Sequence, residues 1–193
     1  MAEPNRLFFA LWPTAEVREA SQQAARDLKI RMQPTGYLSS AERYHITLLF
    51  LGDTVPPERE AAALQAAARV RAAPFDLTLD HAASFRTPQG FPWWLGMREP
   101  PAALRTLYEQ LREAMVRGGA APERLRFTPH LTILRDPRLA LPPTAIKPIA
   151  WRVEEFVLIR SHLDRSPVEY ELLGRWPLNA PPPPEPAAQL SLL

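Results

Sequence analysis

Two copies of one pattern, histidine–apolar–threonine, are the residues of this sequence best suited to chemistry. The first copy is His45-Ile46-Thr47 and the second is His130-Leu131-Thr132, each within an apolar run. Because successive side chains of a strand point to opposite faces, the histidine and the threonine of each copy share a face. One imidazole can donate a proton while the other accepts one, as in-line displacement at phosphorus requires. The pattern therefore predicts a two-histidine acid–base site.

Similar stretches of chain precede the two copies. The apolar run Leu7 to Trp12 is followed by a helical pattern and then by the first copy, and Trp93 to Met97 is followed by a helical pattern and then by the second. The two stretches are almost equal in length, which is typical of an internal duplication of strand, helix and strand. A pseudo-twofold arrangement of the two halves would bring the tripeptides face to face.

Local signals predict the elements that must position these motifs. Thr14 fits the N-cap of a first helix, Pro56-Pro57 opens a second, and Pro100-Pro101 opens a third that ends at Gly118-Gly119. Besides the motif strands, strands are expected at 75–80, 92–97, 153–160 and 170–176, the last two forming a hairpin. The sequence predicts an α+β fold in which helices cover the sheets of both halves.

Composition excludes several classes of site. The 193 residues contain no cysteine, so disulfides, thiolate metal sites and a cysteine nucleophile are excluded. No basic segment precedes a long apolar one, and the run from Leu7 to Trp12 is too short for a signal-peptide core or a membrane span. These features predict a cytoplasmic protein without a membrane partner.

The cationic residues are almost all arginine. Lys29 and Lys147 are the only lysines, and the net charge is +2. Arginine favours bidentate contacts with phosphate, but a GC-rich genome would also encode arginine in preference to lysine. Charge alone therefore does not identify a nucleic-acid-binding protein.

A metal site is the main alternative for two histidines. Zinc catalysis calls for a third protein ligand, and neither tripeptide supplies one. Asp53 and Asp136 follow the two motifs at matching places, where they fit strand-end turns better. The other histidines, His81 and His162, are expected to be surface or packing residues. No metal and no cofactor are predicted.

Four segments together resemble the 2H phosphoesterases, and more narrowly the bacterial and archaeal RNA 2′,3′-cyclic phosphodiesterases, also called LigT proteins or 2′,5′ RNA ligases. The segments are Leu7–Pro13, His45–Gly52, Arg126–Ile133 and Trp176–Leu178. The resemblance covers roughly residues 6–178 in order, and two such motifs with these flanks are more specific than one. It implies a bilobal domain over residues 1–178, in which antiparallel sheets of two pseudo-symmetric, intertwined lobes line a central cleft and helices lie outside.

The resemblance also implies a reaction, the opening of a 2′,3′-cyclic phosphate at an RNA end to leave a 2′-phosphomonoester. By this resemblance His45 is the general acid, His130 is the general base, and Thr47 and Thr132 bind the phosphate. The near symmetry makes the acid and base roles interchangeable at this stage. The ligase activity in the older name is the reverse reaction. Alternatives are an enzyme for small cyclic or 2′,5′-linked nucleotides, or an RNA- or nucleotide-binding module with weak catalysis.

Arg135 matches an arginine that such proteins carry shortly after the second motif to contact the phosphate. Counting from His130, strand parity turns Arg135 away from the cleft, so it can reach the phosphate only if the strand ends or bulges before it. Phe9, Tyr44 and Phe127 are candidates for base stacking, with core packing as the alternative role for at least two of them.

The C-terminal residues 179–193 differ in composition from the rest. Pro181 to Pro184, Glu185 and Pro186 predict an extended, solvated linker after a folded domain that ends near Leu178. The last five residues resemble the pentapeptide by which bacterial replication and repair proteins bind the DNA sliding clamp, with leucine where phenylalanine is commoner. A frayed terminus or pairing with a neighbouring chain is the alternative. The candidate clamp-binding residues are Gln189, Leu190, Leu192 and Leu193.

Overall fold

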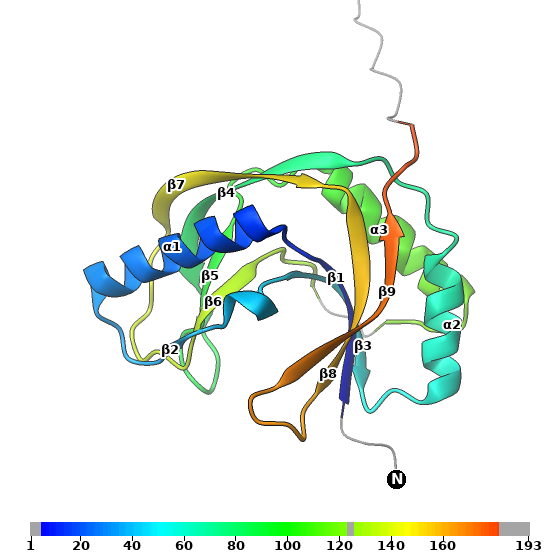
Figure 1. The fold of residues 1–193 in the computed structure, drawn as a ribbon, viewed down its shortest axis with the longest axis horizontal. Coiled ribbons are helices and arrows are strands. Elements are labelled where there is room, and N and C mark those ends of the chain that lie inside the picture. Colours follow the sequence, from blue (N-terminus) through cyan, green and yellow to red (C-terminus); the bar gives the residue numbers. More distant parts are fainter. Residues whose placement is uncertain (1–4, 123–125, 182–193) are drawn as a thin grey trace, which may run out of the picture.

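A single antiparallel sheet with helices against it makes up the fold (Figure 1). The structure is a computed structural model that describes residues 5–122 and 126–181. Its helices are α1 (Ala15–Met32), α2 (Pro57–Ala67), α3 (Ala102–Arg117) and the short 3-10 helix η1 (Ala41–Arg43). Its strands are β1 (Asn5–Leu11), β2 (Tyr37–Leu38), β3 (Ile46–Asp53), β4 (Phe75–Ser84), β5 (Trp93–Gly96), β6 (Leu131–Arg135), β7 (Thr144–Val153), β8 (Glu155–His162) and β9 (Glu169–Pro177).

The order of the strands shows two related halves. The sheet runs β7-β4-β5-β6-β3-β1-β8-β9, and β2 pairs with β6 off this path. The two motif strands, β3 and β6, therefore lie at the centre, with β1 and β5 outside them. Ile46 pairs with Leu131, so the middle residues of the two tripeptides are antiparallel partners. The predicted α+β fold with two pseudo-symmetric halves is confirmed, although the tripeptides lie side by side in one sheet.

The helices link the two halves. Helix α1, which connects β1 to β3, contacts β6 and β7 of the other half. Helix α3, which connects β5 to β6, contacts β3 and α2 of the first half. The expected apolar stripe of α3 is fully buried and consists of Leu104, Leu107, Leu111 and Met115. Each half thus covers its sheet with a helix from the other half.

The local signals correctly predicted most elements. Thr14 caps α1 by accepting a hydrogen bond from the Val17 N–H at 3.4 Å. Strand β7 was not expected, because Pro148 interrupts its sequence. Pro148 is tolerated because β7 is an edge strand and because the register with β4 shifts between Leu79 and His81.

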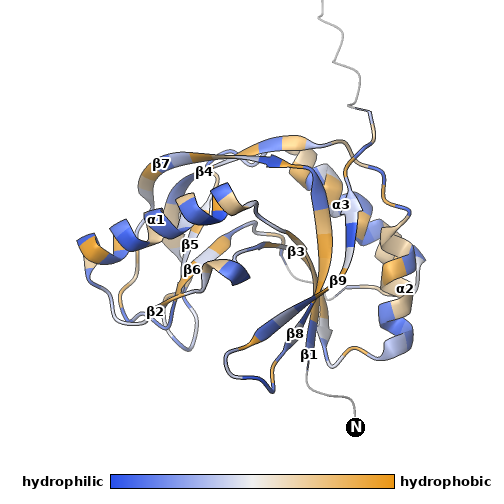
Figure 2. Ribbon diagram, in the orientation of Figure 1, coloured by the Kyte–Doolittle hydropathy of each residue, from blue (hydrophilic) through white to orange (hydrophobic). Residues whose placement is uncertain are grey.

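Alternation along β1 divides its side chains between two apolar clusters. Leu7, Phe9 and Leu11 belong to the main core, on the side of the sheet that the helices cover. Phe8 and Ala10 belong to a smaller cluster with residues of β8, against which Trp12, Phe50 and Tyr170 pack. Hydrophobic residues dominate along β8, whereas the tip of the β8–β9 hairpin is mostly hydrophilic (Figure 2).

The residue after β9 extends its pairing with β8. Leu178 is buried and its N–H donates a hydrogen bond to the Glu154 carbonyl at 2.7 Å. The candidate clamp-binding residues, Gln189, Leu190, Leu192 and Leu193, lie outside the described residues. Within residues 5–122 and 126–181, no helix is long and apolar enough to cross a membrane.

The close approach of β2 to β6 depends on Gly36. Gly36 has φ +88°, and a Cβ there would lie 2.3 Å from the Arg135 carbonyl oxygen. Gly119 has φ +78° but open space around a Cβ, so it is a matched control for backbone strain alone. We expect Gly36→Ala to lower the free energy of unfolding by about 1–3 kcal/mol more than Gly119→Ala in urea titrations. Equal losses would show that β2 moves freely away from β6.

Candidate active site

The two motifs meet in one cleft. Because Ile46 and Leu131 pair and face the core, the histidine and threonine of each motif face the other side of the sheet. The cleft there has a volume of about 530 Å³. Its lining consists of Arg6, Phe8, Tyr37, Arg43, His45, Thr47, Phe50, Asp53, His130, Thr132, Arg135, Ser161, Leu163, Val168 and Tyr170. A groove of about 510 Å³ between α1 and β7 contains neither motif histidine.

Both histidine rings are held in the same way. His45 Nδ1 lies 2.7 Å from the Arg43 carbonyl oxygen, and His130 Nδ1 lies 2.7 Å from the Thr128 carbonyl oxygen. A carbonyl oxygen can only accept a hydrogen bond, so Nδ1 carries the proton in each neutral ring. Nε2 is then left with a lone pair for a ligand in the cleft. The symmetric geometry prepares either ring to accept a proton.

Aromatic rings pack against each histidine. The Phe8 and Tyr170 ring centroids lie 4.9 and 5.6 Å from that of His45. The Phe85 and Trp94 centroids lie 4.8 and 6.3 Å from that of His130. These rings fix the imidazole planes and remove water from one side of each, which disfavours the charged form.

Burial and positive charge keep both histidines neutral in the free protein. Burial is the main cause that lowers the pKa of His45. The hydrogen bond to the Arg43 carbonyl opposes this shift, the charges of Arg135, His130 and Arg18 add to it, and the resulting pKa is about 4. Burial also lowers the pKa of His130, again with Arg135 adding repulsion. An anion in the cleft would favour the imidazolium form of either ring.

A β-bulge brings Arg135 into the cleft. Trp94 pairs with Thr132 but Trp93 pairs with Leu134, so Ile133 is an extra residue in β6. The bulge reverses the alternation, and Arg135 returns to the face of Thr132. The sequence predicted that Arg135 could reach the phosphate only if the strand ended or bulged before it, and the strand bulges at Ile133.

The first motif strand has a corresponding bulge. Ala10 pairs with Thr47 but Phe9 pairs with Leu49, so Leu48 is the extra residue in β3. Phe50 then returns to the cleft face, in the place that Arg135 occupies in the other half. The two halves differ at this position, because one supplies a phenyl ring and the other a guanidinium group.

The aromatic residues expected to stack on bases do not line the cleft. Phe9 is 0% exposed and Tyr44 is 1% exposed, so both pack in the core, which is the alternative role expected for at least two of the three candidates. The alternation that turns Thr47 and Ala10 toward the cleft turns Phe9 away. Tyr44 lies in the main core, whereas its neighbour His45 lines the cleft. Phe127 stacks on Tyr108 with ring centroids 4.2 Å apart and packs against the core.

Other cleft residues were missed. Phe8 could have been found by parity if the pairing of β1 with β3 had been known. Tyr170 comes from the hairpin, and Tyr37 and Arg43 come from the connection between α1 and β3, where no periodic pattern marks them.

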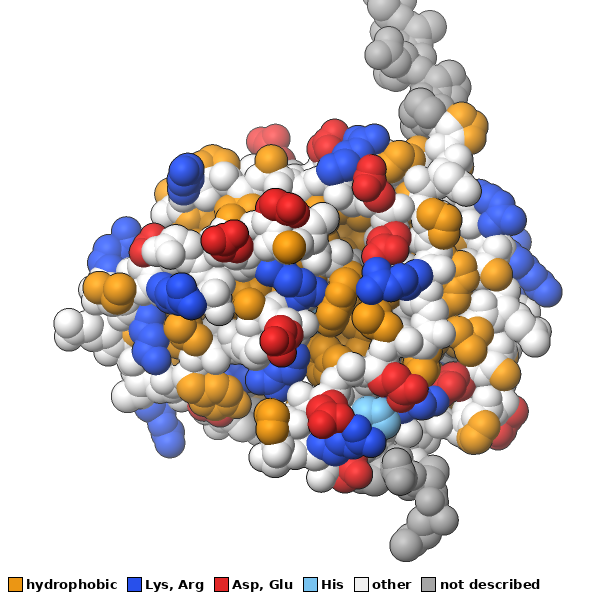
Figure 3. All heavy atoms as spheres, in the orientation of Figure 1, with side chains coloured by type: hydrophobic (Ala, Val, Ile, Leu, Met, Phe, Trp, Pro, Cys, Tyr) orange, Lys and Arg blue, Asp and Glu red, His pale blue; other side chains and the backbone are white. Residues whose placement is uncertain are grey.

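Figure 3 shows hydrophobic side chains gathered in the middle of one face of the molecule, between α1 and β9, with charged side chains around them.

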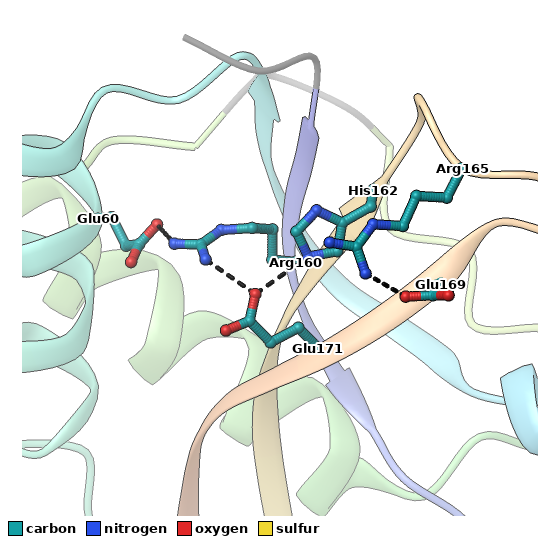
Figure 4. A network of polar contacts seen from close by, with 6 residues as sticks. All are labelled: Glu60, Arg160, His162, Arg165, Glu169 and Glu171. Carbon is teal, nitrogen blue, oxygen red and sulfur yellow. Dashed lines mark hydrogen bonds and ion pairs between the residues drawn. The ribbon is translucent and has the colours of Figure 1, made fainter.

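A polar network holds the hairpin that carries Tyr170 (Figure 4). Arg160 of β8 donates to Glu60 of α2 at 2.6 Å and to Glu171 of β9 at 2.9 Å. Glu171 also lies 3.0 Å from His162 Nε2. These residues alternate with Ser161 and Tyr170, which face the cleft. The network therefore ties the hairpin to α2 on the side away from the cleft.

The two other histidines and the aspartates that follow the two motifs are not part of the acid–base pair. His81 Nδ1 lies 3.0 Å from Asp80, and His162 is 9% exposed. Asp136 has φ +56°, which fits a turn, whereas Asp53 ends β3 and pairs with Arg6 at 2.8 Å within the cleft. In the described part of the chain, no three His, Asp or Glu side chains gather as a metal site would require.

Comparison with known proteins shows which family this chain belongs to. The family model of the 2′-5′ RNA ligase superfamily matches residues 15–165. The RNA 2′,3′-cyclic phosphodiesterase of Escherichia coli K12 is 38% identical over 181 residues, which cover 92% of this chain and 99% of that protein. The protein of the same name from Thermus thermophilus is 33% identical over 186 residues, 90% of each chain. The chain belongs to the 2′-5′ RNA ligase superfamily.

Solved structures agree with membership of the superfamily. The crystal structure of E. coli LigT complexed with 3′-AMP matches with a TM-score of 0.74 at 37% identity, covering 92% of this chain and 99% of that chain. LigT complexed with phosphate matches with a TM-score of 0.70. The superfamily match includes both motifs, whereas β1 and β9, which bring Phe8 and Tyr170 to the cleft, lie outside it.

The charge of Arg135 should be visible in the histidine titrations. We expect Arg135→Met to raise the pKa of both His45 and His130, because a repelling cation is removed and protonation becomes easier. NMR titration of the imidazole carbons measures both values, with His45 near 4 in the wild type. Arg112→Gln, on an exposed position of α3, is the control and should move neither. Unchanged titrations in Arg135→Met would contradict the placement of its guanidinium group.

Proposed function

We propose that this chain hydrolyses the 2′,3′-cyclic phosphate at the end of an RNA and leaves a 2′-phosphomonoester. The observation that carries the proposal is the pairing of Ile46 with Leu131, because it puts His45 and His130 into one cleft. The names of the curated relatives, RNA 2′,3′-cyclic phosphodiesterase, support the same substrate. Reverse ligation would use the same groups.

In the proposed reaction, water adds across one P–O bond. His130 Nε2 removes a proton from the attacking water as its oxygen bonds to phosphorus. The bond between phosphorus and the 3′ oxygen breaks, and His45 Nε2 gives its proton to that oxygen. The products are a 3′ hydroxyl and a 2′-phosphate, and a final proton exchange with solvent resets the two imidazoles. Each proton transfer contributes roughly 10²–10⁴ in rate.

Three groups are proposed to hold the phosphate. Thr47 and Thr132 share faces with the two histidines, where their hydroxyls can donate to the non-bridging oxygens. Arg135 supplies the positive charge that offsets the charge building up on those oxygens. The same guanidinium charge opposes the binding of a metal cation beside the histidines, which supports catalysis without a metal or cofactor.

The acid and base roles are proposed from the resemblance and fit the electrostatics. His130 has a neutral ring with a free Nε2, as a base requires. His45 has its pKa lowered to about 4 in the free protein, so the anionic substrate must raise it before the ring can act as an acid. The proton on His45 then arrives together with the phosphate, and the acid is charged only in the complex.

A defined assay tests the proposed reaction. We expect an oligonucleotide ending in a 2′,3′-cyclic phosphate to be opened in the presence of EDTA, with only the 2′-phosphate formed. His45→Ala and His130→Ala should each lose at least about 100-fold in kcat, because each removes one proton transfer. His81→Ala is the control outside the cleft and should keep activity. A 3′-phosphate product, or wild-type rates in either cleft variant, would contradict the proposal.

A sulfur-containing substrate separates the acid from the base. When sulfur replaces the bridging 3′ oxygen, the leaving thiolate needs little protonation. We therefore expect the sulfur substrate to restore much of the rate of His45→Ala but not that of His130→Ala, measured as the ratio of sulfur to oxygen rates in each variant. Restoration of His130→Ala instead would exchange the two roles.

A small cyclic or 2′,5′-linked nucleotide is the second candidate substrate. The cleft volume of about 530 Å³ is within the range of small-molecule sites and favours this possibility. A binding module with weak catalysis is less consistent with a cleft in which both histidines and both threonines are present.

The tail and the location remain proposals from the sequence. We propose Gln189, Leu190, Leu192 and Leu193 as a peptide for the DNA sliding clamp, supported by the spacing of apolar anchors after a proline-rich segment. A cytoplasmic location is supported by the absence of cysteine from the 193 residues.

A further inference from the structure

The connection between α1 and β3 places two side chains in the cleft that the proposed reaction does not use. These are Tyr37, on β2, and Arg43, at the end of η1. The phosphate that reacts already has Thr47, Thr132 and Arg135. Tyr37 and Arg43 are therefore available for another part of the substrate.

Strand pairing and hydrogen bonds hold this connection against β6 and the residues that follow it. Tyr37 pairs with Arg135, and the Ser39 N–H donates to the Ile133 carbonyl at 2.9 Å. The Arg138 N–H donates to the Thr35 hydroxyl, also at 2.9 Å. Tyr37 is thus held directly beside the arginine proposed to bind the phosphate.

Tyr37 differs from the other aromatic residues of the cleft. Phe8 and Tyr170 contact each other and His45, whereas Tyr37 is 52% exposed. Within residues 5–122 and 126–181, Tyr37 makes no ring contact and belongs to neither apolar cluster. A ring that is exposed on a fastened strand offers a face to a ligand without a large loss of conformational entropy.

Arg43 is a cation of the cleft that has no ion pair among the described residues and no part in the proposed reaction. Arg6 is paired with Asp53, and Arg135 acts on both histidines. Arg43 forms no ion pair with any residue that the structure describes, and the hydrogen bonds it makes there come from its backbone, whose N–H donates to the Ser40 carbonyl and whose carbonyl accepts from His45. The cleft lining has three guanidinium groups against one carboxylate, a formal excess of two positive charges. One charge suits the reacting phosphate and the other suits a second anion.

We propose that Tyr37 and Arg43 form a subsite for the nucleotide on the 5′ side of the cyclic phosphate. Tyr37 stacks on a base, and Arg43 contacts the phosphate that joins the last two nucleotides. This inference rests on the proposed function and deepens it, because the subsite makes the enzyme prefer an RNA end to a single nucleotide. A mononucleotide cyclic phosphate has no second phosphate for Arg43.

The test compares a dinucleotide ending in a 2′,3′-cyclic phosphate with 2′,3′-cyclic AMP. We expect the wild type to have the higher kcat/KM on the dinucleotide. Arg43→Gln and Tyr37→Ala should each lower the dinucleotide-to-mononucleotide ratio by about tenfold, mainly through KM. Tyr37→Phe should keep the ratio because it keeps the ring, and Arg43→Lys should recover part of it. Arg112→Gln is the control for loss of a charge outside the cleft.

Binding gives a second readout that does not need catalysis. Calorimetry with a dinucleotide ending in a 2′-phosphate and with adenosine 2′-monophosphate should show the same tenfold losses for the dinucleotide. The subsite is contradicted if the wild type does not favour the dinucleotide in either measurement. It is also contradicted if Arg43→Gln and Tyr37→Ala weaken both ligands equally. If no cyclic phosphate is opened but the binding differences appear, the proposed function fails and the subsite stands.

Discussion

One β-bridge, between Ile46 and Leu131, is the constraint on which the site depends. It joins β3 to β6 at the centre of the sheet, and each partner is flanked by a histidine and a threonine that face the cleft. A displacement of one residue between these strands would turn one motif toward the core. Helices α1 and α3 secure the junction, because each packs on strands of the opposite half. Because each half is covered by a helix of the other half, the position of one histidine relative to the other depends on the packing of the whole domain.

The two halves are related but not equivalent, and the difference has chemical consequences. Both motif strands bulge just after the threonine, which returns the third residue beyond it to the cleft. In one half that residue is Phe50 and in the other it is Arg135. A symmetric cleft with two arginines would hold more positive charge, whereas one with two phenylalanines would lack the cation beside Thr132 that is proposed to hold the reacting phosphate. The observed pair supplies one apolar wall and one charged wall.

The environment of the two histidines explains why both rings are uncharged in the free protein. Aromatic rings and burial disfavour imidazolium, and Arg135 adds repulsion. The carbonyls that accept from Nδ1 fix the tautomer without supplying a full negative charge. In the proposed reaction, an incoming phosphate would favour the charged form of the acid, His45, while the base, His130, stays neutral. The connection from α1 to β3 also affects the electrostatics of the cleft. It contributes the positive charge of Arg43 to the cleft lining, and the Arg43 carbonyl accepts the hydrogen bond from His45.

The sequence by itself determined the features that depend on neighbouring residues. Alternation put each histidine beside its threonine, caps and prolines marked the helices, and the repeated context indicated two related halves. Only the tertiary structure decided which aromatic residues reach the cleft, since the pairing of β1 with β3 selects Phe8 over Phe9. It also decided that Ile133 bulges and returns Arg135 to the site, and that Tyr37 lies beside Arg135. Periodicity is a property of consecutive residues, whereas register and bulges arise from hydrogen bonds between segments far apart in the chain.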